Sequence, residues 1–479
     1  ARFDDGVPIR AGDFKLAFDT IMKHGRPFFR SFYRDVASAE VLSPLQLKFT
    51  FKTRNNMKPL MNVAELSPAP RHHWQSRDIT KTTLEPWPSS GAYRIKSLDP
   101  GRSITYERVK DYWGADLPTN RGLNNFDTIR YDYYRDLNVM FEAFKAGDID
   151  FRSENSSKRW ATGYKLKSVA NNSVLIETLP DRSPGGIQGL VINTRKPKFA
   201  DVRVREALAT VFDFEWMRKK LLYDQYARTS SYFPNSDYGA SGAPGAEEVT
   251  ALAAFSERIP EQLTTSAFTP SRTDGSGRNR KQVRAALKLF KAAGFTIVDG
   301  KLHTDTGAQM QLEILLVQPD FERLIAPYVQ TLKRIGIQAS IRIVDSSQYE
   351  KRTEEFDFDM TNVRFNFFPP PGPELRSFYG SAAAEQKGSG NWAGVKDPVV
   401  DELIEKVISA KDLETLKVHT RALDRVLLWQ HYIIPQWHND VFRLAYWNRF
   451  SRPAVLPRYG TGFPASWWHD AQKAAQLRR

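Results

Sequence analysis

Residues 310–345 place an apolar strand, an amphipathic helix and a second apolar strand in direct succession. The strands are MQLEILLVQ (310–318) and IQASIRIVD (337–345), with a helix expected from Phe321 to Arg334. Strands joined by a helix usually lie parallel in one sheet, because the crossover helix packs back on it. The unit therefore predicts the α/β fold class. Pro327 lies inside the helix and is expected to kink it or to limit it to its first turns.

The chain is much longer than this one unit. Its 479 residues indicate two or three domains at roughly 150 residues each. Hydrophobic residues make up 41% and charged residues 26%, which is typical of a folded globular protein. The sequence contains no apolar run long enough to span a bilayer and no signal-peptide pattern at its start.

The formal net charge of +14 raises the question of nucleic-acid binding. The basic residues are dispersed, and the densest cluster has no aromatic side chains near it; it consists of Arg278, Arg280, Lys281 and Arg284. We interpret this cluster as a solvated loop and helix start, and we expect no nucleic-acid partner. A basic surface could instead attract anionic lipid headgroups or acidic ligands.

The residues that carry most enzyme chemistry are absent or scattered. The chain has no cysteine, which excludes disulfides, thiolate zinc sites, iron–sulfur clusters and cysteine nucleophiles. The adjacent pair His72-His73 would point in two directions on a helix or strand, so we expect no metal site. No nucleophile elbow, zinc-binding helix, phosphate-binding loop or dinucleotide fingerprint is present. We expect no catalytic residues and no cofactor.

One carboxylate pair keeps a hydrolase open as an alternative. Asp357 and Asp359 occupy alternate positions of FDFDM, so both would face one side of a strand. Glycosidases need two carboxylates roughly 5–10 Å apart across a cleft. Such pairs are more often directed to solvent, and the lack of sharper catalytic motifs favours a binding protein.

Several further elements are marked by their capping residues. Asp136 and Gly147 are expected to begin and end a helix in NVMFEAFKAG, and Asp397 with Pro398 to begin another over 397–411. Pro100-Gly101 is expected to join two strands in a hairpin. Other expected elements are a helix over 11–23, a strand over 45–52, a strand in DTIRYDYYRD, and helices over 283–294 and 415–429.

The stretch GLVINTRKPKFADVRVREALATVFD (189–213) combines a buried strand, a basic loop and a helix. The apolar run Leu190-Val191-Ile192 stops at Asn193, and Asp201 precedes a segment with helical spacing. Val204, Ala207, Leu208 and Val211 share one face of that segment. Strand–loop–helix is a common order, so this stretch alone does not indicate a fold or a function, and the rest of the chain is needed to interpret it.

Six segments, in order, resemble the family 5 solute-binding proteins of bacterial ABC importers, which include oligopeptide, dipeptide and nickel binders. These segments are RFDDGVPIRAGDFKLAFDTI, SSGAYRI, YERVKDYWG, FEAFKAGDIDF, NTRKPKFADVRVREALATVFD and LKRIGIQASIRIVDSSQYEKRTEEFDFDM. The resemblance covers essentially the whole chain. RFNFFPPPGPELRSFYGS, the NWAGVKDPVVDELIEKVI run and ALDRVLLWQHYIIPQWH are most similar to the YejA-like branch, which is associated with oligopeptide and microcin C uptake.

The resemblance implies a periplasmic binding protein fold of type II (cluster C). This fold has two α/β lobes and an extra subdomain, joined by two hinge crossings, here expected at Gly189–Asn193 and Ile433–His438. The expected division is 1–79 for part of the extra subdomain of lobe I, 80–187 for the lobe I core, 188–434 for lobe II, and 435–479 for the return to lobe I. The family's D-G-x-P segment stands at residue 4, so an N-terminal portion of lobe I is expected to be missing.

The resemblance also implies a function. The chain is expected to be the periplasmic binding component of an ABC importer, to capture oligopeptides or peptide conjugates between its lobes, and to deliver them to an inner-membrane permease. It is expected to be a monomer and not an enzyme. The alternatives are another cargo, such as an oligosaccharide or an oligopeptide-like antibiotic, and a cleft hydrolase.

Ligand contacts are expected in three segments. In many relatives an aspartate after the D-[FY]-D-M strand pairs with the ligand's α-ammonium, whereas VRFNFFPPPGPEL offers no acid before Glu374. The ammonium is therefore met elsewhere, or the ligand is not anchored by a free N-terminus. In the alternative interpretation, Phe367 and Phe368 are core residues and Arg364 pairs with an internal acid. The candidate residues are Arg364, Asn366, Phe367, Phe368, Asn391, Trp392, Trp437 and His438.

Overall fold

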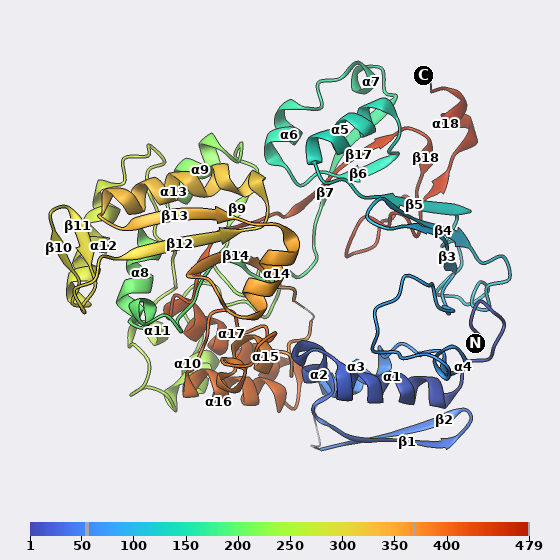
Figure 1. Ribbon diagram of the computed structural model, residues 1–479, viewed down its shortest axis with the longest axis horizontal. Coiled ribbons are helices and arrows are strands. Elements are labelled where there is room, and N and C mark those ends of the chain that lie inside the picture. The colour runs from blue at the N-terminus through green and yellow to red at the C-terminus, as the bar shows by residue number, and fades with distance from the viewer. Residues whose placement is uncertain (53–56, 368, 478–479) are drawn as a thin grey trace.

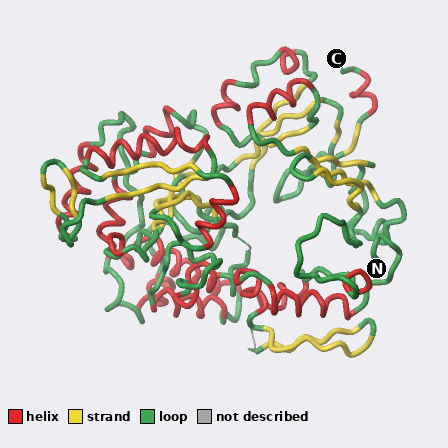
Figure 2. Tube along the Cα trace, in the orientation of Figure 1, coloured by secondary structure: helices red, strands yellow, loops and turns green. Residues whose placement is uncertain are grey.

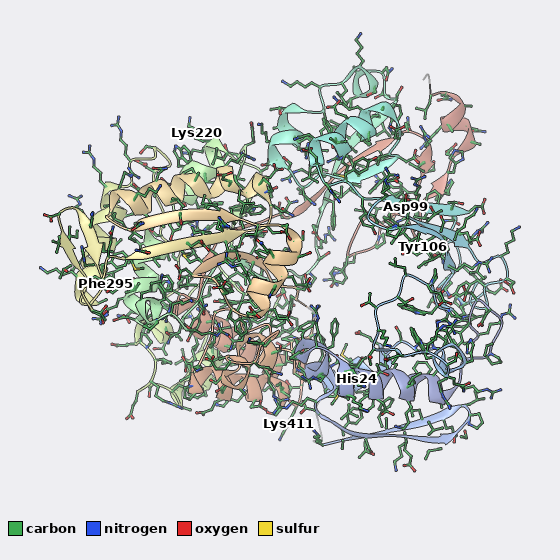
Figure 3. All side chains as sticks on the ribbon, in the orientation of Figure 1. His24, Asp99, Tyr106, Lys220, Phe295 and Lys411 are labelled. Atoms are coloured by element: carbon green, nitrogen blue, oxygen red, sulfur yellow. The ribbon has the colours of Figure 1, made fainter. Side chains whose placement is uncertain are left out.

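The computed structural model describes residues 1–52, 57–367 and 369–477. Its elements gather into three regions (Figure 1). Lobe II is built on a five-stranded sheet, lobe I on the sheets β3–β4–β5 and β6–β17–β7, and the N-terminal subdomain on α1–α4 with the hairpin β1–β2. Figure 3 shows Asp99 and Tyr106 of lobe I on the opposite side of the molecule from Phe295 of lobe II.

The N-terminal subdomain and lobe I contain short sheets and helices. The N-terminal subdomain comprises α1 (Ala11–His24), α2 (Pro27–Tyr33), β1 (Val36–Ser43), β2 (Gln46–Phe51), α3 (Met57–Ala64) and α4 (Arg71–Trp74). Lobe I comprises β3 (Tyr93–Asp99), β4 (Ser103–Arg108), β5 (Thr128–Asp132), α5 (Leu137–Ala146), β6 (Phe151–Ser153), α6 (Ser157–Thr162), α7 (Lys167–Ala170), β7 (Val174–Pro180), β17 (Val441–Trp447), β18 (Phe450–Ser451), β19 (Trp468–His469) and α18 (Ala471–Ala475).

Lobe II contains the long central part of the chain. Its elements are β8 (Gln188–Ile192), η1 (Pro197–Phe199), α8 (Val202–Thr210), α9 (Phe214–Lys220), β9 (Ala227–Arg228), α10 (Ala246–Ala253), α11 (Gln262–Thr265), α12 (Arg280–Ala292), β10 (Thr296–Val298), β11 (Lys301–His303), β12 (Gln311–Leu316), η2 (Pro319–Phe321), α13 (Glu322–Arg334), β13 (Gln338–Ile343), α14 (Ser346–Glu354), β14 (Met360–Arg364), α15 (Leu375–Tyr379), η3 (Ser381–Ala383), α16 (Pro398–Ile408), α17 (Leu413–Trp429), β15 (Ile433–Pro435) and β16 (Trp437–His438).

The central sheet of lobe II has the strand order β13-β12-β14-β8-β15. The strands β12 and β13 pair in parallel, with Ile314 opposite Ile341, and α13 connects them. The strand–helix–strand prediction is therefore confirmed, and the lobe belongs to the α/β class. The strand β8 runs antiparallel to both of its neighbours, with Val191 opposite Thr361 of β14 and Ile433 of β15.

Helices cover both faces of this sheet, which Figure 2 shows as red segments on either side of the central yellow strands. Side chains of a strand alternate between the two faces. Accordingly Val191 packs into the core under α16 and α17, whereas Leu190 and Ile192 pack into the core with α8, α12 and α13. A sheet buried on both faces needs apolar residues at successive positions, which is why Leu190-Val191-Ile192 is uninterrupted.

Asn193 ends β8 and binds the loop that leads into β14. Its Nδ2 donates to the carbonyl oxygens of Phe356 and Phe358, both at 2.9 Å, and its Oδ1 accepts from Arg195 Nη1 at 3.0 Å. Phe356 has φ 56°, a left-handed conformation that non-glycine residues rarely adopt. The fully buried Asn193 side chain thus fixes a strained loop against the end of the central strand.

The capping residues predicted from the sequence act as expected. Asp136 accepts from the backbone N–H groups of Asn138 and Val139, and Gly147 ends α5 with φ 89°. Asp397 accepts from Val399 N at the start of α16. Asp201, which precedes the segment with helical spacing, also caps a helix and accepts from Arg203 N at the start of α8. The hairpin around Pro100-Gly101 is β3–β4, and the strand expected at 45–52 is β2, whose partner β1 was not predicted.

Of the two outcomes expected for Pro327, a kink or an early end of the helix, the second does not occur. The helix α13 continues past Pro327 to Arg334, so the proline does not limit it to its first turns. Packing explains this, because Leu324, Tyr328 and Leu332 bury one face of the helix against the sheet and stabilise it on both sides of the proline.

Asp357 and Asp359 do not form a pair on one strand, because β14 begins only at Met360. Asp357 binds Arg352, with Arg352 Nε 2.9 Å from its Oδ2. Asp359 accepts from Lys198 Nζ at 2.8 Å and from Glu313 N at 3.0 Å. Both carboxylates therefore have structural partners within lobe II.

The N-terminal subdomain contacts lobe II directly. Arg376 of α15 donates from Nη1 to both carboxylate oxygens of Asp35, at 2.9 and 3.1 Å, and also binds Glu405 of α16. The rings of Phe28 and Phe378 lie 5.3 Å apart at the same contact, where α2 meets α15 (Figure 1). The predicted boundaries at 79, 187 and 434 stay predictions.

We expect Asn193→Ala to destabilise lobe II. The change removes the donor to two buried carbonyl groups, and each buried acceptor left without a partner costs roughly 1–3 kcal/mol. Urea denaturation of both proteins measures the loss. Asn171→Ala is the control, since exposed Asn171 accepts only one bond, from Ser173 N. Equal midpoints for the two variants would contradict the role of Asn193.

Candidate functional site

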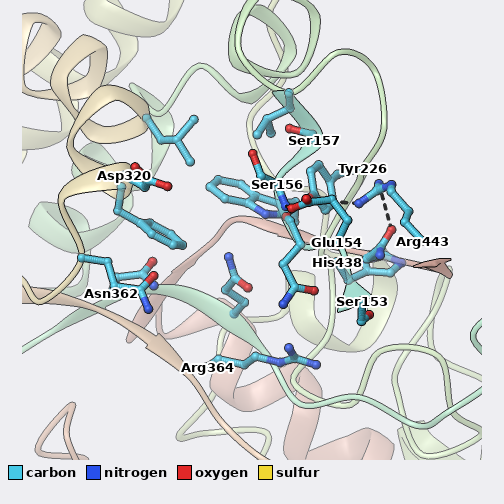
Figure 4. Close-up of a pocket in the computed structure, with 18 of the residues that line it drawn as sticks. Ser153, Glu154, Ser156, Ser157, Tyr226, Asp320, Asn362, Arg364, His438 and Arg443 are labelled. Carbon is cyan, nitrogen blue, oxygen red and sulfur yellow. Dashed lines mark hydrogen bonds between the residues drawn. The ribbon is translucent and has the colours of Figure 1, made fainter. Parts of the chain in front are cut away.

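A cleft of about 640 Å³ lies between the two lobes (Figure 4). Lobe I contributes the segment 152–157 with Arg159 and the first residues of β17, and lobe II contributes 316–318, Asp320, Phe321 and the end of β14. The connecting segments also line it, with Asp181, residues 183–186 and residues 437–439. The site thus depends on strand ends from both lobes.

The floor of the cleft lies where the two connections meet the central sheet. Arg364, the last residue of β14, is opposite Gln188, the first residue of β8. Gln188 Nε2 donates to Gln436 Oε1 at 3.3 Å, which links the two connections. In Figure 4 the exposed Arg364 side chain extends toward the side of the cleft where Ser153 and His438 lie.

Glu154 organises the lobe I wall. Its carboxylate accepts from Arg152 at 2.9 Å, Arg159 at 3.3 Å and the Tyr164 hydroxyl at 3.0 Å, and from the backbone N–H of Ser156 at 2.8 Å. The side chain is only 1% exposed. Burial beside Glu154 raises the pKa of Tyr164 far above its ordinary value, so the hydroxyl stays protonated and donates.

Arg443 of β17 is buried at the side of the cleft without an acidic partner. Its Nη2 donates to Gln225 O at 2.9 Å and to Asn439 Oδ1 at 3.1 Å, and its guanidinium lies 4.8 Å from the ring centroid of Tyr226. The residue is 2% exposed. Within the described ranges, no carboxylate oxygen lies within 4 Å of it.

Aromatic rings form the wall nearest the return connection. Trp437 is buried, stacks with Phe321 at a centroid distance of 6.2 Å, and meets Tyr226 at 6.1 Å. His438 follows it, with Nδ1 3.4 Å from Thr229 Oγ1. Burial lowers the pKa of His438 below its ordinary value, partly opposed by Asp440, so the ring is neutral at pH 7.

The structure brings three of the eight predicted residues into this cleft, namely Arg364, Trp437 and His438. Asn366 and Phe367 instead line a small separate pocket, where Phe367 contacts Phe233 and Tyr238. Phe368 lies outside the described residues. The core interpretation of Phe367 fits its packing, whereas Arg364 has no ion pair among the described residues and so does not fit the internal-acid alternative.

Asn391 and Trp392 lie in a loop of lobe II away from the cleft. The buried Asn391 side chain donates to Gly380 O and Val395 O and accepts from Val395 N. The Trp392 ring contacts those of Tyr349, Phe358 and Phe365. Both residues hold the loop before α16 against the core.

The sequence predictions missed the lobe I wall. Glu154 and Arg443 are far apart in the chain and meet only because β6 pairs with β17, where Arg443 O accepts from Glu154 N. The one available signal was the polar run RSENSS directly after a short apolar segment, which indicates a strand that ends at a surface. Among the described residues, no cluster of His, Asp or Glu could hold a metal ion, and no helix is both long and apolar enough to cross a bilayer.

We expect Glu154→Gln to lower the free energy of unfolding by about 3–5 kcal/mol, because the buried Arg152 and the partly buried Arg159 guanidinium groups then lack their counter-charge. Glu142→Gln is the matched control, since its ion pair with Lys145 is exposed and contributes about 0–1 kcal/mol. Thermal denaturation of both variants tests the difference. A Glu154 variant as stable as the control would show that the lobe I wall does not depend on this network.

Comparisons with known proteins agree with this architecture. A family model described as "Bacterial extracellular solute-binding proteins, family 5 Middle" matches residues 1–386. The probable peptide-binding protein YejA of Agrobacterium fabrum is 41% identical, over 98% of this chain and 78% of that protein. The uncharacterized protein YejA of Escherichia coli is 38% identical, over 100% of this chain and 78% of that protein.

Among solved structures, the oligopeptide-binding protein AppA of Bacillus subtilis, in complex with a nonapeptide, matches with a TM-score of 0.75. The match covers 98% of this chain and 85% of that one, at 18% sequence identity, and so it concerns the fold alone. The expected type II binding-protein fold is confirmed. The chain belongs to the family 5 extracellular solute-binding proteins, a family of binding proteins rather than enzymes, and it is similar to the YejA-like members.

Proposed function

We propose that this protein is the periplasmic substrate-binding component of an ABC importer. It captures oligopeptides or peptide conjugates in the cleft between its lobes and delivers them to an inner-membrane permease. The observation that carries the proposal is the composition of the cleft, which is lined by polar and aromatic side chains from both lobes and from both connections. A ligand seated there contacts both lobes at once.

The size of the cleft favours a short ligand. Its volume of about 640 Å³ lies within the range of roughly 300–1,000 Å³ typical of sites for drug-sized molecules. Peptides in such clefts bind through their main chain, which gives affinity without fixing the side-chain sequence. Bridging waters in a polar cleft accommodate varied side chains.

The cleft supplies acids that meet a peptide α-ammonium, although the segment after β14 has none. Asp320 lines the lobe II side and is exposed, and Asp181 lines the first connection. Neither carboxylate has an ion pair among the described residues. Either can thus replace the aspartate of other relatives as the partner of the α-ammonium.

The two connections form the hinge about which the cleft closes. The strands β8 and β15 are hydrogen-bonded neighbours, so the chain passes between the lobes twice at nearly the same place. Rotation about this paired segment changes the gap between lobes without breaking either core. A ligand that touches both walls stabilises the closed arrangement by its differential affinity for it.

Peptide binding predicts ligand-dependent thermal stabilisation. We expect the melting temperature of protein freed of ligand by unfolding and refolding to rise with a mixed tripeptide pool. The stabilisation at about 100-fold excess over Kd is about 2.7 kcal/mol. Mass spectrometry of small molecules released from freshly purified protein then identifies the natural cargo. An oligosaccharide that carries no peptide, or an unchanged melting temperature with peptides, would contradict peptide capture.

A pair of tryptophan substitutions locates the site. Gln318→Trp places a bulky ring at the lobe II edge of the cleft and is expected to abolish the peptide-induced rise in melting temperature. Gln472→Trp makes the same change on exposed α18 and leaves the rise intact. If both variants respond to peptides like the parent protein, the ligand binds elsewhere.

A further inference from the structure

The charged side chains that line the cleft are mostly basic. Five arginines face three carboxylates among its lining residues: Arg152, Arg159, Arg323, Arg364 and Arg443 against Glu154, Asp181 and Asp320. The imbalance concerns the described residues that line the cleft and is separate from the dispersed positive charge of the whole chain. Only the charged side chains that have no ion-pair partner within the protein are fully available to a ligand.

Glu154 is already engaged. It binds Arg152 and Arg159 at 2.9 and 3.3 Å and accepts two further hydrogen bonds, so it offers nothing to a ligand cation. The Nε and Nη1 atoms of Arg152 are buried and have no hydrogen-bond partner among the described residues, although the guanidinium lies 5.3 Å from the ring centroid of Phe141. One carboxylate thus serves two guanidinium groups, which leaves a positive excess at the lobe I wall.

The other three arginines have no carboxylate within ion-pair distance among the described residues. Arg443 is buried and binds neutral oxygens only. Arg323 donates to Leu221 O at 3.2 Å, and Arg364 is exposed at the floor. Burying the Arg443 guanidinium without a counter-charge is costly, so an anion that enters the cleft relieves an electrostatic penalty there, while the accessible Arg364 guanidinium is free to bind the anion directly.

We propose that the cleft selects peptides that carry an anionic group in addition to their C-terminal carboxylate, and that Arg364 is the main determinant of this selectivity. Arg364 is the exposed guanidinium at the floor, where a planar carboxylate or phosphate can be bound by two parallel N–H donors. Arg323 and Arg443 add to the positive potential from the two walls. Asp181 and Asp320 remain available to bind the single α-ammonium group of such a ligand.

This inference rests on the proposed function and is tested by titration calorimetry with synthetic tripeptides. Ala-Glu-Ala and Ala-Gln-Ala are nearly identical in shape and differ in one charge, and Ala-phosphoserine-Ala distinguishes a phosphate from a carboxylate as the preferred anion. We expect Ala-Glu-Ala to bind at least about tenfold more tightly than Ala-Gln-Ala at low salt. The preference weakens with added salt, because the cleft is open to solvent.

Two matched variants test whether Arg364 produces the preference for Ala-Glu-Ala over Ala-Gln-Ala. Arg364→Gln is expected to reduce the Glu-over-Gln preference to about threefold or less, while the affinity for Ala-Gln-Ala changes little. Arg278→Gln removes the same charge from an exposed loop and keeps the preference. Arg323→Gln is a second cleft variant with an intermediate effect expected.

The outcomes separate the two proposals. If the parent protein binds Ala-Gln-Ala as tightly as Ala-Glu-Ala, the selectivity proposal is wrong and peptide binding stands. If none of the three peptides binds, peptide capture fails and the selectivity proposal fails with it. A preference that survives in Arg364→Gln overturns the assignment to Arg364. Tighter binding of the phosphoserine peptide supports anion selection and names phosphate as the favoured group.

Discussion

The pairing of β8 with β15 is the constraint on which the rest of the structure depends. It sets Val191 beside Ile433, and the buried residues of both strands belong to the two cores of lobe II. Because both connections between the lobes begin at this pair, the same side of each lobe borders the cleft. The strand ends, including Gln188 and Arg364, then fall at the floor of the cleft. The pairing of β8 with β15 therefore determines both the core packing of lobe II and the geometry of the cleft.

The sequence predicted local structure well wherever a short segment determines its own conformation. Asp136 and Gly147 set the ends of α5 by hydrogen bonding and by a left-handed backbone, and both are visible in the sequence alone. The helix α13 continues past Pro327 because distant parts of lobe II pack against its buried face. Tertiary packing can stabilise a helix that its own residues would interrupt.

The residues of the candidate site were predicted less well, because their positions also depend on packing between distant parts of the chain. Arg364, Trp437 and His438 reach the cleft because they follow buried strands in segments that the family resemblance marks. Asn391 has similar surroundings in the sequence but uses its side chain to close a loop. The Glu154 network needs β6, α6 and β17 together, and no local pattern reports such a combination. The same types of polar residue line the cleft and bind the backbone, so residue type alone does not distinguish the two roles.

The contact between the N-terminal subdomain and lobe II is a second link across the molecule, and under the proposed closure its strength affects how the cleft responds to ligand. The pair Arg26–Glu350 is exposed and contributes little, whereas the Asp35 and Arg376 side chains are only 12% and 20% exposed. Arg376 keeps Glu405 as a partner within lobe II. Separation of the subdomain therefore leaves Asp35, rather than Arg376, without its ion pair. The proposed closure then has a ligand-independent contribution from this contact, and the proposed binding of anions by the unpaired arginines of the cleft would supply the part that depends on the charge of the ligand.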